Sequence, residues 1–257
     1  MIKNAFNCFS CKARGNVLDF VAAMEKCSVR DAGLKLQEWF SISDVPAADT
    51  TKAKPKPERG VEKESLVNPP LKFQLRGIDH EHEYLKTRGI TPETALTFGV
   101  GYFSGKGSMS GRVVIPIHDA NGELVAYAGR AIDNSEPRYK LPTGFHKSLE
   151  LFNLHRVGDP EVVLVEGFFD CMKVMQAGFC AVALMGCSLS EAQEELLAKT
   201  FERVILMLDG DEPGQQGRGE CLARLGRRMW VRAAMVPEGK QPDQLSTEEI
   251  QQFLGSF

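Results

Sequence analysis

The chain has 257 residues, of which 43% are hydrophobic and 25% charged, and a formal net charge of −3 at pH 7. This composition is ordinary for a globular protein of one large or two modest domains, and the charge excludes a general binder of polyanions. No stretch approaches the roughly 20 apolar residues of a membrane span and the N-terminus has no apolar signal-peptide core, so we expect a cytoplasmic protein without membrane contact.

The first segment, residues 1–42, combines a cysteine knuckle with helical patterns. Cys8 and Cys11 have the Cys-x-x-Cys spacing of two zinc ligands. Apolar residues at helical spacing predict two helices within 16–40. Residues 43–70 are rich in Pro, Lys and Glu and nearly lack large apolar side chains, which predicts a flexible linker.

The next region, residues 71–157, is expected to contain two short helices followed by a hairpin. Thr91 and Pro92 are a typical start for the second helix. Strand-like runs lie on both sides of Asn121 and Gly122, a dipeptide that is typical of hairpin turns.

In the last region, residues 158–257, strand patterns alternate with helix patterns. Strands are predicted at 161–166, 180–186, 203–209 and 229–237, and helices at 168–178, 190–201 and 213–228. Ser190 and Gln193 fit a capping box at the start of the second of these helices. Such alternation favours an α/β fold with a parallel sheet and helices on its faces.

Two of these strands end in carboxylates: Glu166 ends the first, and Asp209 ends the third, with Asp211 two residues later. Since the carboxyl ends of parallel strands meet at one edge of a sheet, we expect these acids to converge. Close carboxylates repel one another unless protons or cations neutralise them, and oxygen ligands suit Mg²⁺ that also binds phosphate. For Asp211 alone, an N-cap of the helix at Pro213 is an equal alternative.

The same region resembles a known fold family through three motifs. The segments VEGFFDCMKVMQAG, ALMGCSLSEAQEELL and ILMLDGDEPGQQG are similar to the Toprim fold of bacterial and phage-type (DnaG-like) DNA primases. The matching positions are those of the Glu-Gly-x-x-Asp motif, the glycine after the second strand and the Asp-x-Asp motif with its glycine, namely Glu166, Gly167, Asp170, Gly186, Asp209, Asp211 and Gly214. The motifs occur in the family's order and spacing, so together they are far more specific than a single Asp-x-Asp.

The resemblance implies an architecture and roles for the acids. It implies a Rossmann-like Toprim domain over 158–257, preceded by a smaller α+β subdomain of the primase core over 71–157. Glu166 is then a catalytic acid/base or metal ligand, and Asp209 and Asp211 are catalytic ligands of Mg²⁺ (or Mn²⁺). Asp243 matches a further metal-binding acid after the last strand, whereas Gln241 stands where the family has a second acid, and Asp170 is expected to support the first helix.

Residues 71–157 extend the resemblance to the N-terminal subdomain of the primase catalytic core. This match separates primases from other Toprim enzymes and implies nucleic-acid or nucleotide-binding side chains, namely Arg88, Arg112, Arg130, Arg138 and Lys147, with Lys140 as a neighbouring candidate. Arginine and lysine neutralise phosphates and displace their counterions. A solvated surface is the alternative for any one of these residues, and it is the favoured interpretation for the arginines after the Asp-x-Asp turn, namely Arg218, Arg224, Arg227 and Arg228.

The knuckle of Cys8 and Cys11 resembles the second half of the primase zinc-binding domain. The family's other two ligands, a Cys and a His, would lie upstream of it. Since structural zinc takes four fixed ligands and only two are present, we expect no stable Zn²⁺. Two interpretations stay open: the segment is a zinc-finger remnant, or the true start of the protein lies upstream.

The resemblance implies a DNA primase-like nucleotidyltransferase that makes short RNA primers on a single-stranded DNA template from ribonucleoside triphosphates. It implies a replicative helicase or a separate zinc-bearing chain as further partners, in a phage or other mobile-element setting. Two alternatives stay open: a Toprim nuclease or strand-transfer enzyme, which needs only the acids, and a non-catalytic nucleic-acid-binding module of a mobile element.

Overall fold

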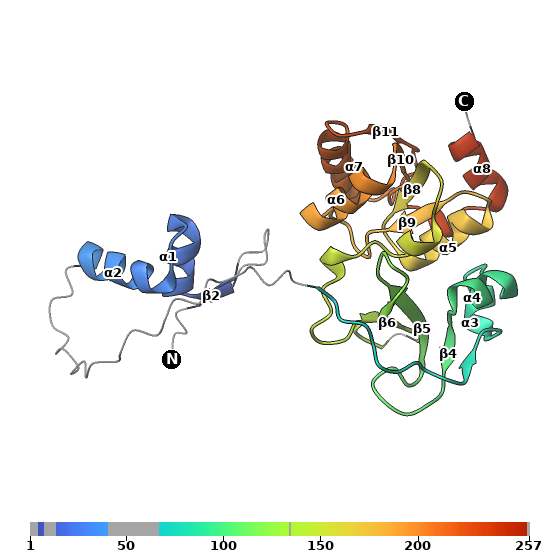
Figure 1. The fold of residues 1–257 in the computed structure, drawn as a ribbon, viewed down its shortest axis with the longest axis horizontal. Coiled ribbons are helices and arrows are strands. Elements are labelled where there is room, and N and C mark those ends of the chain that lie inside the picture. Colours follow the sequence, from blue (N-terminus) through green and yellow to red (C-terminus); the bar gives the residue numbers. More distant parts are fainter. Residues whose placement is uncertain (1–4, 8–13, 41–66, 134, 256–257) are drawn as a thin grey trace. The chain divides into compact units, whose positions relative to one another are not determined.

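The computed structural model describes residues 5–7, 14–40, 67–133 and 135–255 (Figure 1). The chain divides into two compact units, residues 1–63 and residues 64–257. Each unit is described by itself.

In the first unit a short hairpin precedes two helices. Strands β1 (Ala5–Asn7) and β2 (Arg14–Asn16) pair antiparallel. Helices α1 (Val17–Glu25) and α2 (Val29–Phe40) follow and confirm the two predicted helices. Cys8, Cys11 and most of the predicted linker lie outside the described residues.

The second unit begins with an antiparallel sheet of strand order β3-β4-β5-β6-β7. Its elements are β3 (Ile78–Asp79), α3 (Glu83–Thr87), α4 (Pro92–Phe98), β4 (Gly101–Phe103), β5 (Arg112–His118), β6 (Leu124–Ala131) and β7 (Tyr139–Lys140). The Thr91 side chain accepts from the Thr94 N–H and caps α4 as predicted. The predicted hairpin joins β5 to β6, and Gly122 adopts a φ of +84°, a left-handed conformation that glycine adopts without a steric penalty.

A parallel sheet of strand order β11-β10-β8-β9 follows and confirms the predicted α/β alternation. Its strands are β8 (Glu161–Val165), β9 (Ala181–Ala183), β10 (Arg203–Leu206) and β11 (Trp230–Ala233). The helices are α5 (Phe168–Gln176), α6 (Glu191–Thr200), α7 (Glu212–Leu225) and α8 (Thr247–Gly255), and the 3₁₀ turns are η1 (Lys147–Leu149), η2 (Leu154–Arg156) and η3 (Pro242–Gln244). Ser190 and Gln193 form the predicted capping box of α6.

The order of the parallel strands determines where a ligand can bind. After β8 the chain forms β9 on one side of it, and then crosses back to form β10 on the other side. The chain therefore changes direction at β8, and the adjacent carboxyl ends of β8 and β10 form a topological switch point. In open α/β sheets ligands bind at such a point.

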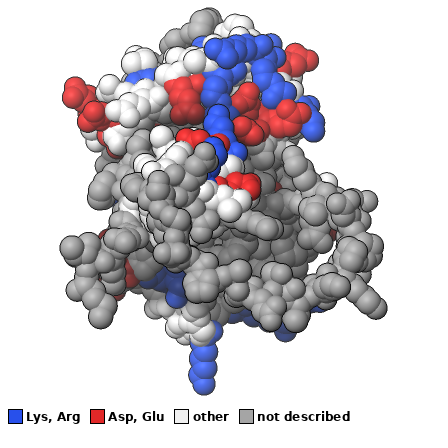
Figure 2. Space-filling view, turned by 90° about the vertical axis from the view of Figure 1, so that its left-hand side faces the viewer, with Lys and Arg blue, Asp and Glu red and all other residues white. Residues whose placement is uncertain are grey.

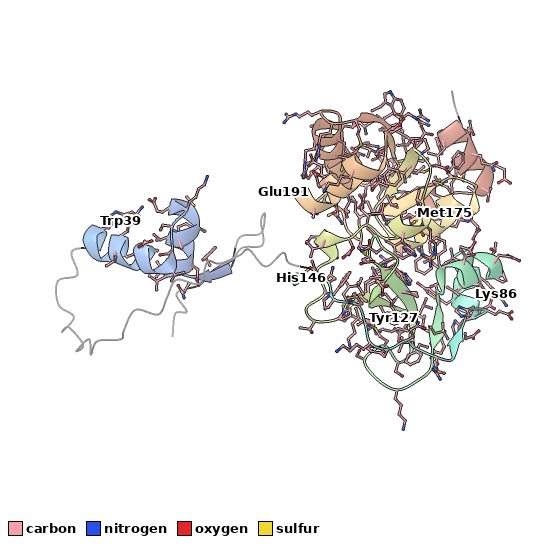
Figure 3. All side chains as sticks on the ribbon, viewed as in Figure 1. Trp39, Lys86, Tyr127, His146, Met175 and Glu191 are labelled. Carbon is pink, nitrogen blue, oxygen red and sulfur yellow. The ribbon has the colours of Figure 1, made fainter. Side chains whose placement is uncertain are left out.

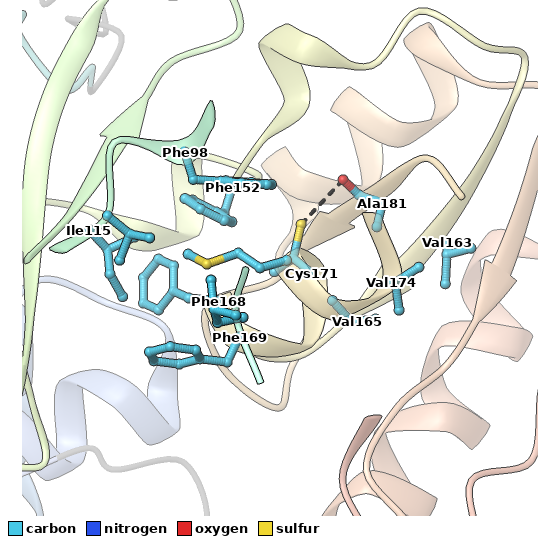
Figure 4. Packing of buried hydrophobic residues seen from close by; sticks show 14 of the residues in the cluster. Phe98, Ile115, Phe152, Val163, Val165, Phe168, Phe169, Cys171, Val174 and Ala181 are labelled. Atoms are coloured by element: carbon cyan, nitrogen blue, oxygen red, sulfur yellow. Dashed lines mark hydrogen bonds between the residues drawn. The ribbon is translucent and has the colours of Figure 1, made fainter. Parts of the chain in front are cut away.

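A single hydrophobic cluster joins the two sheets of the second unit (Figure 4). The ring of Phe98, from α4, stacks on that of Phe152 with centroids 5.7 Å apart. The ring of Phe168, from α5, meets Phe152 edge-on at 4.9 Å. Phe168 and Ile115 of β5 also belong to this cluster, so α5 packs against residues of both sheets. The predicted boundary between a subdomain at 71–157 and a Toprim domain at 158–257 therefore stays a prediction, since residues from both sides of it share one core.

Basic and acidic side chains neutralise each other on the face formed by α6 and α7. Helix α6 begins at Glu191, which is labelled in Figure 3. Arg224 pairs with Glu194 at 2.6 Å, and Arg228 pairs with Glu195 at 2.7 Å. The upper part of Figure 2 shows such interspersed charges. Contrary to the expectation of a solvated side chain, Arg218 is only 9% exposed, and its Nη1 donates to Sδ of Met235 at 3.3 Å.

Among the described residues, no helix is long and apolar enough to cross a membrane.

A pair of histidines is expected to make the second unit sensitive to acid. The rings of His118 and His155 lie 4.6 Å apart, and both Nδ1 atoms are buried without a partner. Burial first, and then Arg156, lower the pKa of both imidazoles, that of His155 to about 4 from 6.5, although Asp119 opposes the shift. The unfolded chain therefore binds protons that the folded chain does not, and stability is lost as the pH falls from 6.5 towards 4.

We expect His155→Gln to reduce the fall in melting temperature between pH 7 and pH 4.5, as measured by circular dichroism. His146→Gln, which changes an exposed imidazole, serves as the control. Equal acid sensitivity in both variants would contradict the assignment.

Candidate active site

The acids at the switch point are brought together by the register of the two central strands. Leu206 of β10 lies beside Leu164 of β8, and the Met207 N–H donates to the Leu164 carbonyl at 2.9 Å. The two strands therefore end side by side. Directly beyond them, the backbone N–H of Asp209 donates to Oε1 of Glu166 at 3.1 Å.

Asp209 is held on one side and free on the other. Asp209 is only 7% exposed, and its Oδ2 accepts from Nε2 of Gln241 at 2.6 Å. Its Oδ1 is buried without a hydrogen-bond partner. A buried carboxylate oxygen without a partner is costly, so this atom is suited to a bound cation.

Asp211 forms the N-cap of α7, as the alternative interpretation predicted. Its Oδ1 accepts from the Gly214 N–H at 2.9 Å, which satisfies one of the free donors at the start of the helix. Asp211 is exposed, and its role as a metal ligand stays a prediction.

Gly214 allows the start of α7 to approach the acids. A Cβ at this position would overlap the carbonyl oxygen of Asp209 and lie 3.0 Å from Oε1 of Glu166. Only glycine therefore fits here without moving the backbone of the Asp209 turn.

Two carboxylates at this edge have raised pKa values. Burial, followed by repulsion from Asp209, raises the pKa of Glu166 to about 7. Burial also raises the pKa of Asp209, and the hydrogen bond from Gln241 opposes that shift. A proton or a cation would relieve the repulsion.

These acids share a cavity of about 380 Å³ with a lysine. The cavity is lined by Tyr139, Leu141, Lys147, Glu166, Gly167, Phe168, Met185, Gly186 and Asp209. Nζ of Lys147 donates to the Met185 carbonyl at 2.9 Å, and Met185 adopts a φ of +60°, which is uncommon for a residue other than glycine. Of the six predicted basic residues, Lys147 is thus the one that lines the same cavity as Glu166.

Within the part of the chain that the structure describes, no three His, Cys, Asp or Glu side chains are grouped so that they could hold a metal by themselves. Such a cage is not required for Mg²⁺. This ion keeps several waters and is commonly bound by one or two carboxylates together with substrate phosphates. The side chains of Glu166 and Asp209 line the same cavity and are sufficient for that mode of binding.

Asp170 and Asp243 lie next to each other behind this edge. As predicted, Asp170 supports α5, since its Oδ2 accepts from the Gly167 N–H at 3.0 Å. Its Oδ1 accepts from the Asp243 N–H at 2.9 Å. Burial and then repulsion from Asp243 raise the pKa of Asp170 to about 8.

Asp243 and Arg88 form an ion pair with each other. The Arg88 guanidinium also lies 5.1 Å from the centre of the Phe169 ring. Both charged residues line a separate cavity of about 550 Å³. In this arrangement Asp243 is neutralised by a residue that was predicted to bind nucleic acid, and both predicted roles stay untested.

Arg130 and Arg138 line the largest of these cavities, of about 730 Å³. Arg130 is only 7% exposed; its Nε donates to the Tyr84 hydroxyl at 3.0 Å, and its guanidinium lies 4.8 Å from the centre of the Tyr139 ring. Arg138 is exposed at the entrance to β7. Burial raises the pKa of Tyr139 to about 12, so its hydroxyl stays neutral beside Arg130.

The other predicted basic residues lie nearby on the same antiparallel sheet. Arg112 donates to the carbonyls of Gly129 and Pro137, at 3.2 and 2.9 Å, and so supports the loop between β6 and β7. Lys140 is half-buried in β7.

Sequence reasoning missed the contacts that hold the segment around η1, which includes Lys147, in place. Nε2 of Gln193 donates to the carbonyls of Glu150 and Leu184, at 2.8 and 3.0 Å, and thereby ties the segment after η1 to the end of β9. Asn68 binds the backbone of His146, at the start of η1 (Figure 3). The capping-box pattern revealed Gln193, but no sequence signal shows which distant carbonyls its amide reaches.

A parallel sheet whose central strands end in a glutamate and an Asp-x-Asp turn defines the chain as a Toprim protein. Residues 163–246 match the family model described as Toprim-like. Residues 107–158 match the DNA primase catalytic core, N-terminal domain, and residues 1–52 match the CHC2 zinc finger. The chain belongs to the DnaG-type DNA primase family.

Curated relatives support this assignment. The DNA primase of Deinococcus radiodurans is 30% identical over 284 residues, which cover 93% of this chain and 49% of that protein. The DNA primase of Geobacillus stearothermophilus is 29% identical, covering 94% and 49%. The chain spans about half the length of the curated relatives it matches.

Solved structures are similar over the same parts. The Aquifex aeolicus primase, with its zinc-binding and RNA polymerase domains, gives a TM-score of 0.61 at 26% identity and covers 99% of this chain and 73% of its own. A DNA primase domain from Pseudomonas aeruginosa gives 0.59 at 26% identity, covering 68% and 70%. The primase fragment of the bacteriophage T7 primase-helicase protein, at 0.51 and 21% identity, shares the fold.

Proposed function

We propose that this chain is a nucleotidyltransferase that makes short RNA primers on single-stranded DNA from ribonucleoside triphosphates. The observation that carries the proposal is the cavity in which Glu166, Asp209 and Lys147 meet at the switch point. Family membership supports the proposal, because both the Toprim segment and the primase-core segment match.

The family implies the use of a divalent metal, and we propose that Glu166, Asp209 and Asp211 hold Mg²⁺ or Mn²⁺. The unpartnered Oδ1 of Asp209 and the space left by Gly214 beside Glu166 suit such an ion. A bound metal would lower the pKa of an attacking hydroxyl and stabilise charge on the transferred phosphoryl group. Asp243 would act behind these ligands, through the network that it forms with Asp170.

The protein's own side chains supply the remaining chemistry. A cation beside Asp209 would lower the pKa of Glu166 from its metal-free value of about 7, so that an ionised Glu166 could accept the proton of a primer 3′-hydroxyl near neutral pH. Lys147 would neutralise triphosphate oxygens in the same cavity. Arg130 and Arg138 would bind phosphates of template or nucleotide, supported by Arg112 and by Lys140, while Arg88 would require release from Asp243.

Partners follow from the same proposal. In one similar solved structure, a DnaG primase catalytic domain is bound to single-stranded DNA. The fold that this chain shares with that domain supports a DNA template. A replicative helicase and a separate zinc-bearing chain are proposed as further partners. For Cys8 and Cys11 we expect stable zinc only if two further ligands come from elsewhere.

Incubation with closed circular single-stranded DNA, labelled ribonucleoside triphosphates and Mg²⁺ tests the function. We expect labelled oligoribonucleotides that resist DNase and require the template. Linearised or shortened DNA would instead support a nuclease or strand-transfer enzyme. Bound but unchanged DNA, without new RNA, would support a non-catalytic binding module.

A further inference from the structure

Gln241 makes a short hydrogen bond to an acid of the proposed metal site. It lies directly before η3 and donates from Nε2 to Oδ2 of Asp209 at 2.6 Å. An amide nitrogen can only donate, so the bond places a neutral donor against a carboxylate that is already surrounded by other acids.

The backbone around Gln241 is fixed independently of this bond. The Gly210 N–H donates to the Lys240 carbonyl at 2.9 Å, and the Gly239 N–H donates to the Gly210 carbonyl at 3.2 Å. The Gln241 N–H donates to Oε1 of Gln244 at 2.7 Å. The loop is therefore attached to the Asp209–Gly210 turn, and the amide group is delivered to Asp209 by a prearranged backbone.

The bond makes the two oxygens of Asp209 unequal. Oδ2 is occupied by the amide, whereas Oδ1 is buried and has no partner. Groups that bind the second atom of a metal ligand fix its orientation, and their loss typically weakens metal binding by about 10–100-fold.

We propose that Gln241 is a positioning residue that holds Asp209 so that only Oδ1 is presented to a divalent cation. The inference rests on the proposed function, since it assumes that Asp209 binds metal. It adds that the neutral amide, rather than another acid, sets the strength of that binding in this chain.

Three variants test the proposal in the full chain. Gln241→Met removes the donor and keeps the length of the side chain. Gln241→Glu keeps the shape and replaces the donor with a carboxylate. Gln244→Glu is the matched control, because it makes the same charge change on the same loop at an exposed position and can still accept from the Gln241 N–H.

The first measurement is Mn²⁺ affinity by isothermal titration calorimetry, without DNA or nucleotide. We expect Gln241→Met to bind Mn²⁺ about 10–100-fold more weakly than the unchanged protein. Gln244→Glu should stay within about threefold, since charge effects at exposed sites are screened by salt.

The second measurement is the melting temperature with and without Mn²⁺. Gln241→Glu places two carboxylates in contact, so the metal-free protein should melt at a lower temperature than Gln244→Glu. Saturating Mn²⁺ should raise the melting temperature of Gln241→Glu by more than that of the unchanged protein.

Two results would overturn the inference, and they differ in what they leave standing. If the unchanged protein binds Mn²⁺ and Gln241→Met binds it equally well, Gln241 does not position Asp209, while the metal site and the proposed function stand. If the unchanged protein binds no Mn²⁺ in the absence of nucleotide, the inference fails, and the primer-synthesis assay decides the proposed function separately.

Discussion

Replacing Glu166 with Gln is expected to lower primer synthesis by about 10²–10⁴-fold, the usual contribution of a positioned acid or base, while it raises the melting temperature of the metal-free protein at pH 8. The two effects have one cause. The carboxylate that we propose for the reaction is also one that the folded state accommodates poorly, because it is partly buried beside Asp209.

The sign of the stability change follows from the pKa of Glu166. This pKa is about 7 in the folded protein against an ordinary value of 4.5. The folded state therefore holds a proton that the unfolded chain has released, and ionised Glu166 reduces stability progressively as the pH rises from about 4.5 to 7. Glutamine removes this effect, so the gain should be largest at pH 8 and should disappear near pH 4.

Thermal melts across that pH range, together with a primer-synthesis assay, measure both effects. Glu202→Gln, which removes an exposed carboxylate between α6 and β10, is the control and should change neither quantity appreciably. Retained synthesis in Glu166→Gln would remove Glu166 from the chemistry. A lower melting temperature at pH 8 would show that its environment is not the repulsive one described above.

Gly214→Ala should damage both the fold and the activity. The added methyl group would overlap the Asp209 carbonyl, which belongs to the backbone and has no rotamer to adopt. Overpacking of this kind typically costs about 1–3 kcal/mol. It should also move Asp209 relative to Glu166, and misplacement of catalytic groups by about 1 Å can cost roughly 10²-fold in rate.

Gly219→Ala provides a matched control on the same helix. Gly219 is exposed on α7, and a Cβ there would meet no atom within 4 Å. Alanine should therefore stabilise this variant by about 0.5–1 kcal/mol, as expected for glycine in a helix interior. Urea unfolding and primer synthesis measure the pair. Equal stability and activity in the two variants would rule out the close approach at Gly214.

Local patterns predicted much of the fold and the central part of the site. The alternation after residue 158 shows the parallel sheet because a buried strand and an amphipathic helix leave different periodicities. Glu166 and Asp209 could be placed at one edge because both follow such strands. The very short strands β3 and β7 were missed, since two residues carry no periodicity and pair only once the sheet exists.

The contacts that refine the site depend on long-range packing. The ion pair of Arg88 with Asp243 joins residues that are 155 positions apart, and nothing in either segment indicates the other. The bond from Gln241 to Asp209 was likewise invisible, although the unusual residue at 241 could be noticed. Arg218 was expected in solvent because charge is normally exposed, and nothing in the sequence indicates its contact with Met235.

The hydrophobic cluster that α5 shares with both sheets limits how the second unit can be dissected. A fragment beginning at residue 158 would retain the acids, yet it would present the rings of Phe168 and Phe169 to water, without the partners that cover them in the intact unit. Such a fragment would tend to self-associate. If evolution replaced residues 71–157 with another basic domain, that domain would need an apolar surface that matches α5 as well as its own arginines.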